Sequence, residues 1–315
     1  MTARLLPFFI QLVQSYIFLI VAALVIGLFL PQYAIYLAPF ATLALQAIFF
    51  LTSLKLDMRG VLAAARNIKM LVSANVFMLV LLPAAVFLLA NAIVPEMAVA
   101  LLLLASMPTG MTAPLLTEVV GGKTDIALVL TLTTSLLAPF TVPFVIGLFA
   151  GTAITVGAWT MFWSLIKVII VPFVLAQGVR AVANGRIRRI APMFKPISLL
   201  LLCLLIAGVV AKQADVILAG FGETIALQLL VLFAFVALLL ALGYFVAFWR
   251  HCAERATVSV CMTFMNFTLA IYLAGSFFAD PRVLLASVLI IFPWTLLLLP
   301  FRAIMRRLVC KKSLS

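Results

Sequence analysis

The sequence predicts an all-α membrane protein of about ten transmembrane helices, and three observations lead to this fold class. Hydrophobic residues make up 67% of the 315-residue chain and charged residues only 9%, whereas about a quarter of the residues in soluble domains are charged. Apolar stretches repeatedly reach the ~20 residues that cross ~30 Å of hydrocarbon as a helix. These stretches are continuous rather than alternating, which favours helices over a closed barrel, the other structure that lipid permits.

Ten apolar segments follow one another along the chain, with short polar gaps between them. We expect spans at 12–30, 35–54, 70–92, 98–118, 125–149, 157–180, 197–212, 222–249, 256–278 and 283–303. Basic residues gather in alternate gaps, which is the pattern of the positive-inside rule. Of the 21 Lys and Arg, 18 would then lie on the cytoplasmic side: Arg4, Lys55, Arg59, Arg66, Lys69, Lys123, Arg180, Arg186, Arg188, Arg189, Lys195, Arg250, Arg255, Arg302, Arg306, Arg307, Lys311 and Lys312.

This alternation places both termini in the cytoplasm. Because most of the chain is apolar, we expect the lipid bilayer to be its main partner. Only Lys212 and Arg282 would lie on the opposite side. The same bias accounts for the net charge of +13, so we expect no nucleic-acid binding. A compact chain without an evident cleavable signal suggests the inner membrane of a bacterium.

The two halves of the sequence resemble one another weakly. Residues 121–125, before the fifth span, are similar to residues 279–282, before the tenth. Pro139 and Pro143 then interrupt the fifth span, and Pro293 and Pro300 interrupt the tenth. Five helices in each half would insert with opposite topology. We therefore predict two inverted five-helix repeats, residues 1–150 and 151–315, in one integral membrane unit, with a substrate bound where they meet.

The fourth span contains the sequence Ser106-Met-Pro-Thr-Gly-Met-Thr-Ala-Pro114. Pro108, Gly110 and Pro114 interrupt helical hydrogen bonding, and the freed carbonyl groups need partners inside hydrocarbon. We interpret this as a functional break in the helix, the alternative being a simple packing kink. The ninth span contains the amide Asn266 at the equivalent depth but no Pro or Gly there, so its residues alone give a weaker indication of a break.

Polar side chains near these two places are the candidate binding residues. The substrate-binding candidates are Thr109, Thr112, Asn266, Thr268 and Thr295, and the ion-binding candidates are Thr131, Thr134 and Thr263. Thr hydroxyls also bond to their own helix backbone, which is the alternative role. Lys167 is the one charge inside a span. It is either an intramembrane contact for substrate or ion, or a side chain that extends to the interface.

At these residues the chain resembles the bile acid:sodium symporter superfamily. The resemblance covers essentially the whole length and is densest in Ser106–Thr117, Thr131–Pro143, Ser164–Pro172 and Thr257–Ala274. It implies ten helices in two inverted repeats, arranged as a panel domain and a core domain. It also implies that helices four and nine are broken and cross at mid-membrane, and that the protein moves an organic anion inward with sodium.

The family's sodium ligands, carried over residue by residue, are mostly absent. A Ser-Asn pair falls on Ala113 and Pro114, a serine on Ala127, a glutamate on Cys261, and two glutamines on Met265 and Met78. Thr131 and Asn266 are the ligands that remain. Sodium prefers oxygen ligands, and sulfur suits it poorly. All eight carboxylates also lie at or near helix ends, so a sodium ion would depend on backbone carbonyls and threonines. We expect no metal site and no cofactor.

Three functions follow as hypotheses. The first is a secondary transporter of an organic anion or amphipathic small molecule by alternating access, with sodium coupling lost or much reduced. The second is a membrane protein on the same fold that no longer transports and acts as a sensor or assembly partner. The third is an arsenite-type efflux transporter, which ranks lowest because the helix-four break has no cysteine. Enzyme activity is not expected, because the sequence shows no nucleophile–base pair and no cluster of metal ligands.

Overall fold

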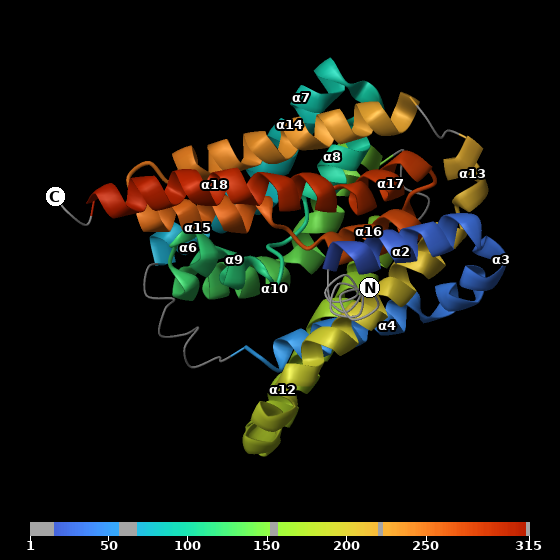
Figure 1. Cartoon of the computed structure of the whole chain (residues 1–315), viewed down its shortest axis with the longest axis horizontal. Helices are drawn as coiled ribbons and strands as arrows, with labels where there is room; N and C mark the ends of the chain where they lie inside the picture. The colour runs from blue at the N-terminus through green and yellow to red at the C-terminus, as the bar shows by residue number, and fades with distance from the viewer. Residues whose placement is uncertain (1–15, 57–67, 152–156, 220–222, 313–315) are drawn as a thin grey trace, which may run out of the picture.

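The described part of the chain forms a bundle of helices, most of which run along the long axis of the molecule (Figure 1). A computed structural model describes residues 16–56, 68–151, 157–219 and 223–312. Within these ranges it has no extended strand, and Thr109 and Met265 form an isolated bridge. Seven described helices are long and apolar enough to cross a membrane. They are Pro31–Ser53, Lys69–Ile93, Thr124–Ala150, Ala158–Ala183, Arg189–Ala211, Ile225–Val246 and Pro281–Met305.

Three shorter apolar helices complete the set, namely Phe18–Phe29, Pro95–Ala105 and Phe267–Phe277. They fall in the first, fourth and ninth predicted spans, and the seven long helices fall in the other seven. The all-α membrane fold class predicted from the sequence is therefore confirmed.

The helices of the first three spans contain local departures from α geometry. Pro31 begins a short helix as its first residue, where its missing N–H costs nothing, and Pro39 lies in the 3₁₀ turn that follows. The third span contains a π-helical turn, a feature often found at functional sites. The elements are α2 Tyr16–Phe29, α3 Pro31–Ala34, η1 Ile35–Phe40, α4 Ala41–Ser53, α6 Ile68–Val76, η2 Phe77–Leu81 and α7 Leu82–Ile93.

The fourth and ninth spans are each split into two helices. α8 Ala98–Ala105 follows the 3₁₀ turn η3 Pro95–Met97 and is separated from α9 Ala113–Val120, and α15 Cys252–Thr263 is separated from α16 Phe267–Phe277. Between and around them lie α10 Thr124–Ala150, α11 Ala158–Leu165, the π turn η5 Ile166–Ile170, α13 Ala214–Ala219, α14 Glu223–Val246, α17 Pro281–Leu289 and α18 Ile291–Lys312.

The segment between the sixth and seventh spans is helical and contains a kink. We expected a polar gap over 181–196. Here α12, Val171–Ala211, consists of two helices joined by a kink at Ala183 (φ −122°, ψ 25°), and the membrane-length helices Ala158–Ala183 and Arg189–Ala211 lie on either side of the gap. Figure 1 shows α12 projecting below the rest of the bundle. The guanidinium of Arg180 donates to the carbonyls of Leu54 and Leu56, so this extension is tied to the end of α4.

α12 packs along α4, α2 and η1, and this group forms one part of the molecule. The approach is close because Gly208 lies against the backbone of Leu37 and Ala38, where an added Cβ would be 2.7 Å from the Ala38 nitrogen. The split helices pack mainly with α7, α10, α14, α17 and α18, and α16 also contacts α12 and α4. This grouping resembles the panel and core domains that the family resemblance implies. The boundary between repeats at residue 150 stays a prediction.

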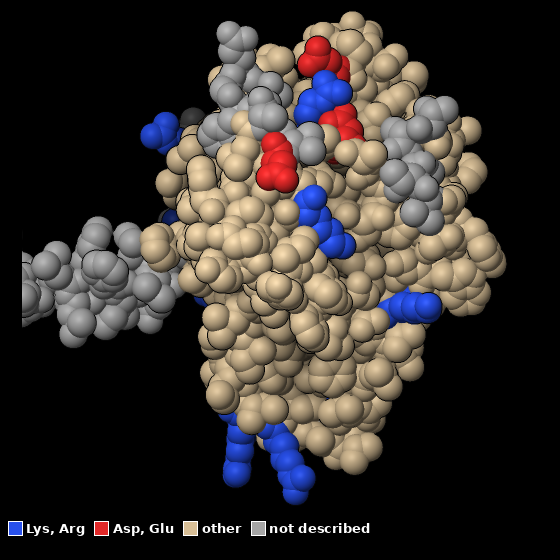
Figure 2. Space-filling view, turned by 90° about the vertical axis from the view of Figure 1, so that its right-hand side faces the viewer, with Lys and Arg blue, Asp and Glu red and all other residues tan. Residues whose placement is uncertain are grey.

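The surface has the character expected in lipid. Large apolar side chains are exposed along many helices, among them Leu43, Leu88, Phe144 and Leu230 at 61–68%. The face in Figure 2 is mostly uncharged, with a few acidic and basic side chains near its top and two basic side chains projecting at its bottom. Arg4, Arg59 and Arg66 lie outside the described residues, and the orientation of the chain in the membrane stays a prediction.

Candidate substrate site at the helix crossing

The two broken helices cross through their non-helical segments, which pair like two short strands. Thr109 and Met265 form an antiparallel bridge. The amide of Gly110 donates to the carbonyl of Phe264 at 2.8 Å, and the amide of Asn266 donates to the carbonyl of Pro108 at 2.7 Å. Backbone groups that each helix loses at its break are therefore satisfied by the other helix, as a buried backbone requires.

Gly110 is the residue that permits this close approach. A Cβ at its position would lie 2.8 Å from the carbonyl oxygen of Phe264 and 2.9 Å from that of Met265. Both contacts are with backbone, which cannot move aside without breaking the crossing. The glycine that the sequence singled out as a helix breaker is thus required by packing between the two segments.

Four helix ends meet at the crossing. The C-termini of α8 and α15 reach it at Ala105 and Thr263, and the N-termini of α9 and α16 leave it at Ala113 and Phe267. Asn266 caps α16, because its side-chain oxygen accepts the Leu269 amide at 3.1 Å. Helix N-termini carry partial positive charge and C-termini partial negative charge. The crossing therefore places both signs of backbone charge at one buried point.

Threonines from three elements surround the crossing. The hydroxyl of Thr109 donates to the carbonyl of Cys261 at 3.0 Å, and the Thr109 amide donates to the hydroxyl of Thr134 at 3.1 Å. Thr131 and Thr263 are fully buried, and their hydroxyl oxygens have no hydrogen-bond partner among the described residues. A buried hydroxyl normally has a partner, so these two oxygens are the groups best placed to meet a ligand.

The structure brings together some of the candidate residues and not others. Thr109, Thr134, Thr131, Thr263 and Asn266, together with Pro108 and Gly110, lie at or beside the crossing. Pro114 is buried in the first turn of α9, and Thr268 in the first turn of α16.

Three other candidates are partly or fully exposed. Thr112 is exposed before α9. The hydroxyl of Thr295, on α18, bonds to the Ile291 carbonyl at 2.8 Å. Lys167 is exposed on the π turn of the sixth span, where its carbonyl accepts the side-chain amide of Gln46 at 3.1 Å.

Two polar groups were missed by the sequence analysis. The side-chain amide of Asn75 donates to Thr133 at 3.0 Å, which links α6 to α10. The hydroxyl of Tyr272 lies 2.9 Å from that of Ser164, which links α16 to α11. An amide or hydroxyl within an otherwise apolar span was the available signal, but the sequence does not show which helix supplies its partner.

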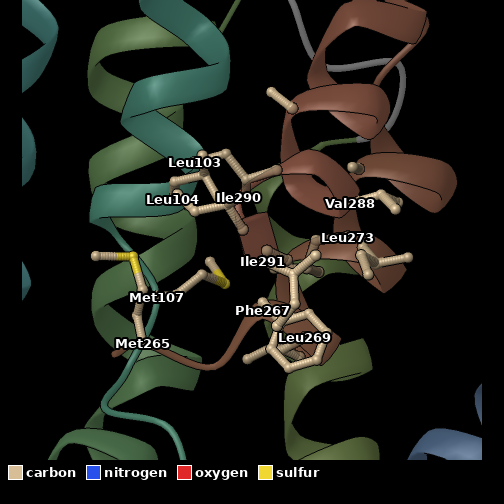
Figure 3. Packing of buried hydrophobic residues seen from close by; sticks show 14 of the residues in the cluster. Leu103, Leu104, Met107, Met265, Phe267, Leu269, Leu273, Val288, Ile290 and Ile291 are labelled. Atoms are coloured by element: carbon tan, nitrogen blue, oxygen red, sulfur yellow. The ribbon is translucent and has the colours of Figure 1, made fainter. Parts of the chain in front are cut away.

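Aliphatic and sulfur-containing side chains pack around the crossing (Figure 3). Figure 3 shows Met107 and Met265 where the two non-helical segments pass, next to Leu103, Leu104 and Ile290. Cys261 is fully buried in the same cluster. Within the described ranges no three His, Cys, Asp or Glu residues gather as a metal site.

A helical membrane protein with two helices broken at a shared crossing has the architecture of a secondary transporter. The comparison with protein families agrees: residues 42–220 match the sodium bile acid symporter family. This match covers more than half of the chain, which therefore belongs to that family. The family is one of membrane transporters, and the predicted recognition is confirmed. No curated protein matches the chain in the corresponding search.

Proposed function

We propose that this protein is a secondary transporter of an organic anion or amphipathic small molecule, working by alternating access with sodium coupling lost or much reduced. The observation that carries the proposal is the crossing, where Thr109 and Met265 pair and four helix ends meet. In secondary transporters, broken helices direct their termini at a substrate bound near mid-membrane.

An anionic group is the ligand that the helix N-termini favour. α9 and α16 both begin at the crossing, and helix N-termini carry partial positive charge. The amides of Ala113, Phe267 and Leu269 already donate within the chain, so the attraction comes mainly from the helix dipoles. The hydroxyls of Thr131 and Thr263, buried and without a partner among the described residues, would supply further donors. The surrounding aliphatic and Met side chains suit the apolar part of an amphipathic substrate.

Weak sodium coupling follows from the side chains at the positions of the family's ligands. Ala113, Ala127 and Cys261 are fully buried there, and Met265 and Met78 are 3% and 5% exposed. None of these five side chains offers an oxygen atom. A buried cation without a carboxylate would rely on carbonyl groups, and those of Pro108, Cys261 and Phe264 already accept hydrogen bonds within the crossing.

Uptake into proteoliposomes tests this function. The purified protein would be reconstituted and assayed for uptake of a bile salt or a small carboxylate, with and without a sodium gradient. We expect uptake of an anion that changes little when the gradient is removed. Uptake that strictly requires sodium would refute the weak coupling, and the absence of both uptake and binding would refute transport.

A pair of asparagine variants tests the placement of the substrate. Asn266 caps α16 at the crossing, whereas Asn91 lies exposed on α7. Asn266→Ala should weaken anion binding at least several-fold, and Asn91→Ala should leave it unchanged. Equal affinities of the two variants would move the site away from the crossing.

A non-transporting protein on the same fold is the second candidate. The buried Ala113, Ala127 and Cys261 favour it, because a fold that has lost its ion ligands has also lost one way of driving transport. Such a protein would bind an anion without moving it, so binding to the detergent-solubilised protein combined with no uptake would support this alternative.

A further inference from the structure

A groove on the side of the bundle lies outside the crossing. It has a volume of about 690 Å³ and is formed by α6 and the π turn that follows, together with the end of α14 and part of α15. Its outer wall includes Val72, Val76 and Leu81, whose side chains are 57%, 48% and 54% exposed. The groove is therefore accessible from the surrounding membrane.

The inner surface of the groove is apolar. Met70, Ala247 and Val258 form its floor, packed together and buried. Ser73, the hydroxyl residue in the lining, donates to the Met70 carbonyl of its own helix at 3.0 Å. A surface of this kind binds hydrocarbon without leaving polar atoms unsatisfied.

Two cations flank one end of the groove. Lys69 directly precedes Met70 in the lining. The backbone amide of Arg250 donates to the carbonyl of Ala247. Because Met70 and Ala247 pack together, the two cations lie beside the same part of the groove. The guanidinium Nε of Arg250 is 2.5 Å from a carboxylate oxygen of Glu254. With Glu254 included, this end of the groove has a net charge of +1, which matches the single negative charge of a phosphodiester.

Aromatic residues place this end at the membrane interface. Trp249 lines the groove and is 58% exposed, and the neighbouring Phe248 and Phe245 are 71% and 63% exposed. Trp and Tyr concentrate at the headgroup level of membranes, where their rings contact both apolar and polar regions. Lys69 and Arg250 are also among the basic residues that the sequence assigns to the cytoplasmic side.

The length of the groove fits one leaflet. Lys69 and Leu81 are 12 residues apart along α6 and the π turn, which corresponds to about 18 Å at the helical rise. Half of the hydrocarbon core of a bilayer is about 15 Å. An acyl chain beginning at the two cations would therefore reach Leu81 near the middle of the membrane.

We propose that this groove binds an anionic phospholipid, with the phosphate at Lys69 and Arg250 and an acyl chain along Val72, Val76 and Leu81. The positive charge at Lys69 and Arg250 provides the preference for an anionic headgroup. The apolar wall of the groove provides the affinity for the acyl chain. This lipid site lies outside the crossing, because none of the residues that form the crossing lines the groove; Met78, at the position of a family ion ligand, is part of the lining.

Quenching of Trp249 fluorescence by brominated lipids tests the proposal. The chain has four Trp residues, so the variant Trp159→Phe, Trp163→Phe, Trp294→Phe leaves Trp249 as the reporter. It would be reconstituted in phosphatidylcholine vesicles containing phosphatidylglycerol, with bromine on one lipid or the other. We expect the anionic lipid to quench more strongly than its bulk fraction explains, with a preference of about fivefold for the one net positive charge at this end of the groove.

Lys69→Gln is the decisive variant, because Lys69 is exposed and its loss leaves no buried group unpaired. It should reduce the preference about fivefold, while Arg189→Gln, an exposed cation on α12, should not change it. Equal quenching by the two lipids, or equal effects of the two variants, would refute the site.

Discussion

The two breaks that form the crossing differ in composition and in length. The break in helix four spans residues 106–112 and contains Pro108 and Gly110, with Pro114 just beyond it. The break in helix nine spans residues 264–266 and contains neither Pro nor Gly. Its backbone nevertheless leaves the helical region, with ψ of 70° at Phe264 and 82° at Asn266.

The difference shows that one break is local in origin and the other depends on tertiary contacts. Pro108 removes a helical hydrogen bond, and Gly110 is unfavourable inside a helix, so helix four contains local causes of its break. Helix nine gives up helical bonds at Phe264 and Asn266, and these two residues bond to Gly110 and Pro108 instead. The segment that is broken by its own sequence therefore provides the partner that holds the other segment open.

Gly110 gives the largest expected effect, because it is the point where the two segments touch. In Gly110→Ala the new Cβ would meet two backbone carbonyls at 2.8 and 2.9 Å, so we expect a loss of about 3 kcal/mol in unfolding free energy and loss of transport. Unfolding in mixed micelles measures the first and proteoliposome uptake the second.

Gly178→Ala is the matched control for this change. Gly178 lies in α12 with no atom within 4 Å of an added Cβ. The alanine should be neutral or stabilise by up to about 1 kcal/mol, since glycine is unfavourable inside a helix. A tolerated alanine at position 110 would show that the segments do not need this close approach.

Two buried threonines at the crossing differ in whether their hydroxyl group has a hydrogen-bond partner, so their valine variants can be compared for stability. The hydroxyl of Thr109 bonds to the Cys261 carbonyl, whereas that of Thr263 has no partner in the described part of the chain. Thr109→Val should lower the unfolding free energy by about 1 kcal/mol, and Thr263→Val should leave it unchanged or raise it. The reverse order would mean that Thr263 holds a partner that matters more for stability than the bond between the segments.

The sequence predicted the features that depend on local composition. Each predicted span contains one of the apolar helices, because length and hydropathy alone decide whether a segment can cross a bilayer. The break at Pro108 and Gly110 was predicted for the same kind of reason. The break at Asn266 followed from the family resemblance more than from its own residues.

The rest depended on which elements meet in three dimensions. Nothing local shows that Thr109 finds Cys261, which is 152 positions away, or that Asn75 pairs with Thr133. The gap between spans six and seven separates two membrane-length helices, but its composition, with basic residues such as Arg186 and Arg189, did not show that the gap itself is helical. Arg and Lys are good helix formers, and α12 continues through them.

Asn266 tests how much a local cap contributes to the break that lacks Pro and Gly. Its side chain accepts the Leu269 amide at the start of α16, and removal of such a cap costs about 1 kcal/mol. We expect that loss in Asn266→Ala and much less in Asn266→Ser, because serine is also a good cap. Unfolding in mixed micelles measures both, and equal losses would show that the amide acts through a contact other than the cap.

Pro114 gives the smallest expected effect and tests the other side of the comparison. It lies in the first turn of α9, where a backbone N–H has no intrahelical partner and proline is well tolerated. Pro114→Ala should therefore change the unfolding free energy by less than about 1 kcal/mol and leave transport intact. If this variant fused α8 and α9 into a continuous helix and abolished uptake, the break in helix four would depend on Pro114 rather than on Pro108, Gly110 and the bonds to helix nine. Far-ultraviolet circular dichroism and uptake, measured on the same preparation, distinguish the two outcomes.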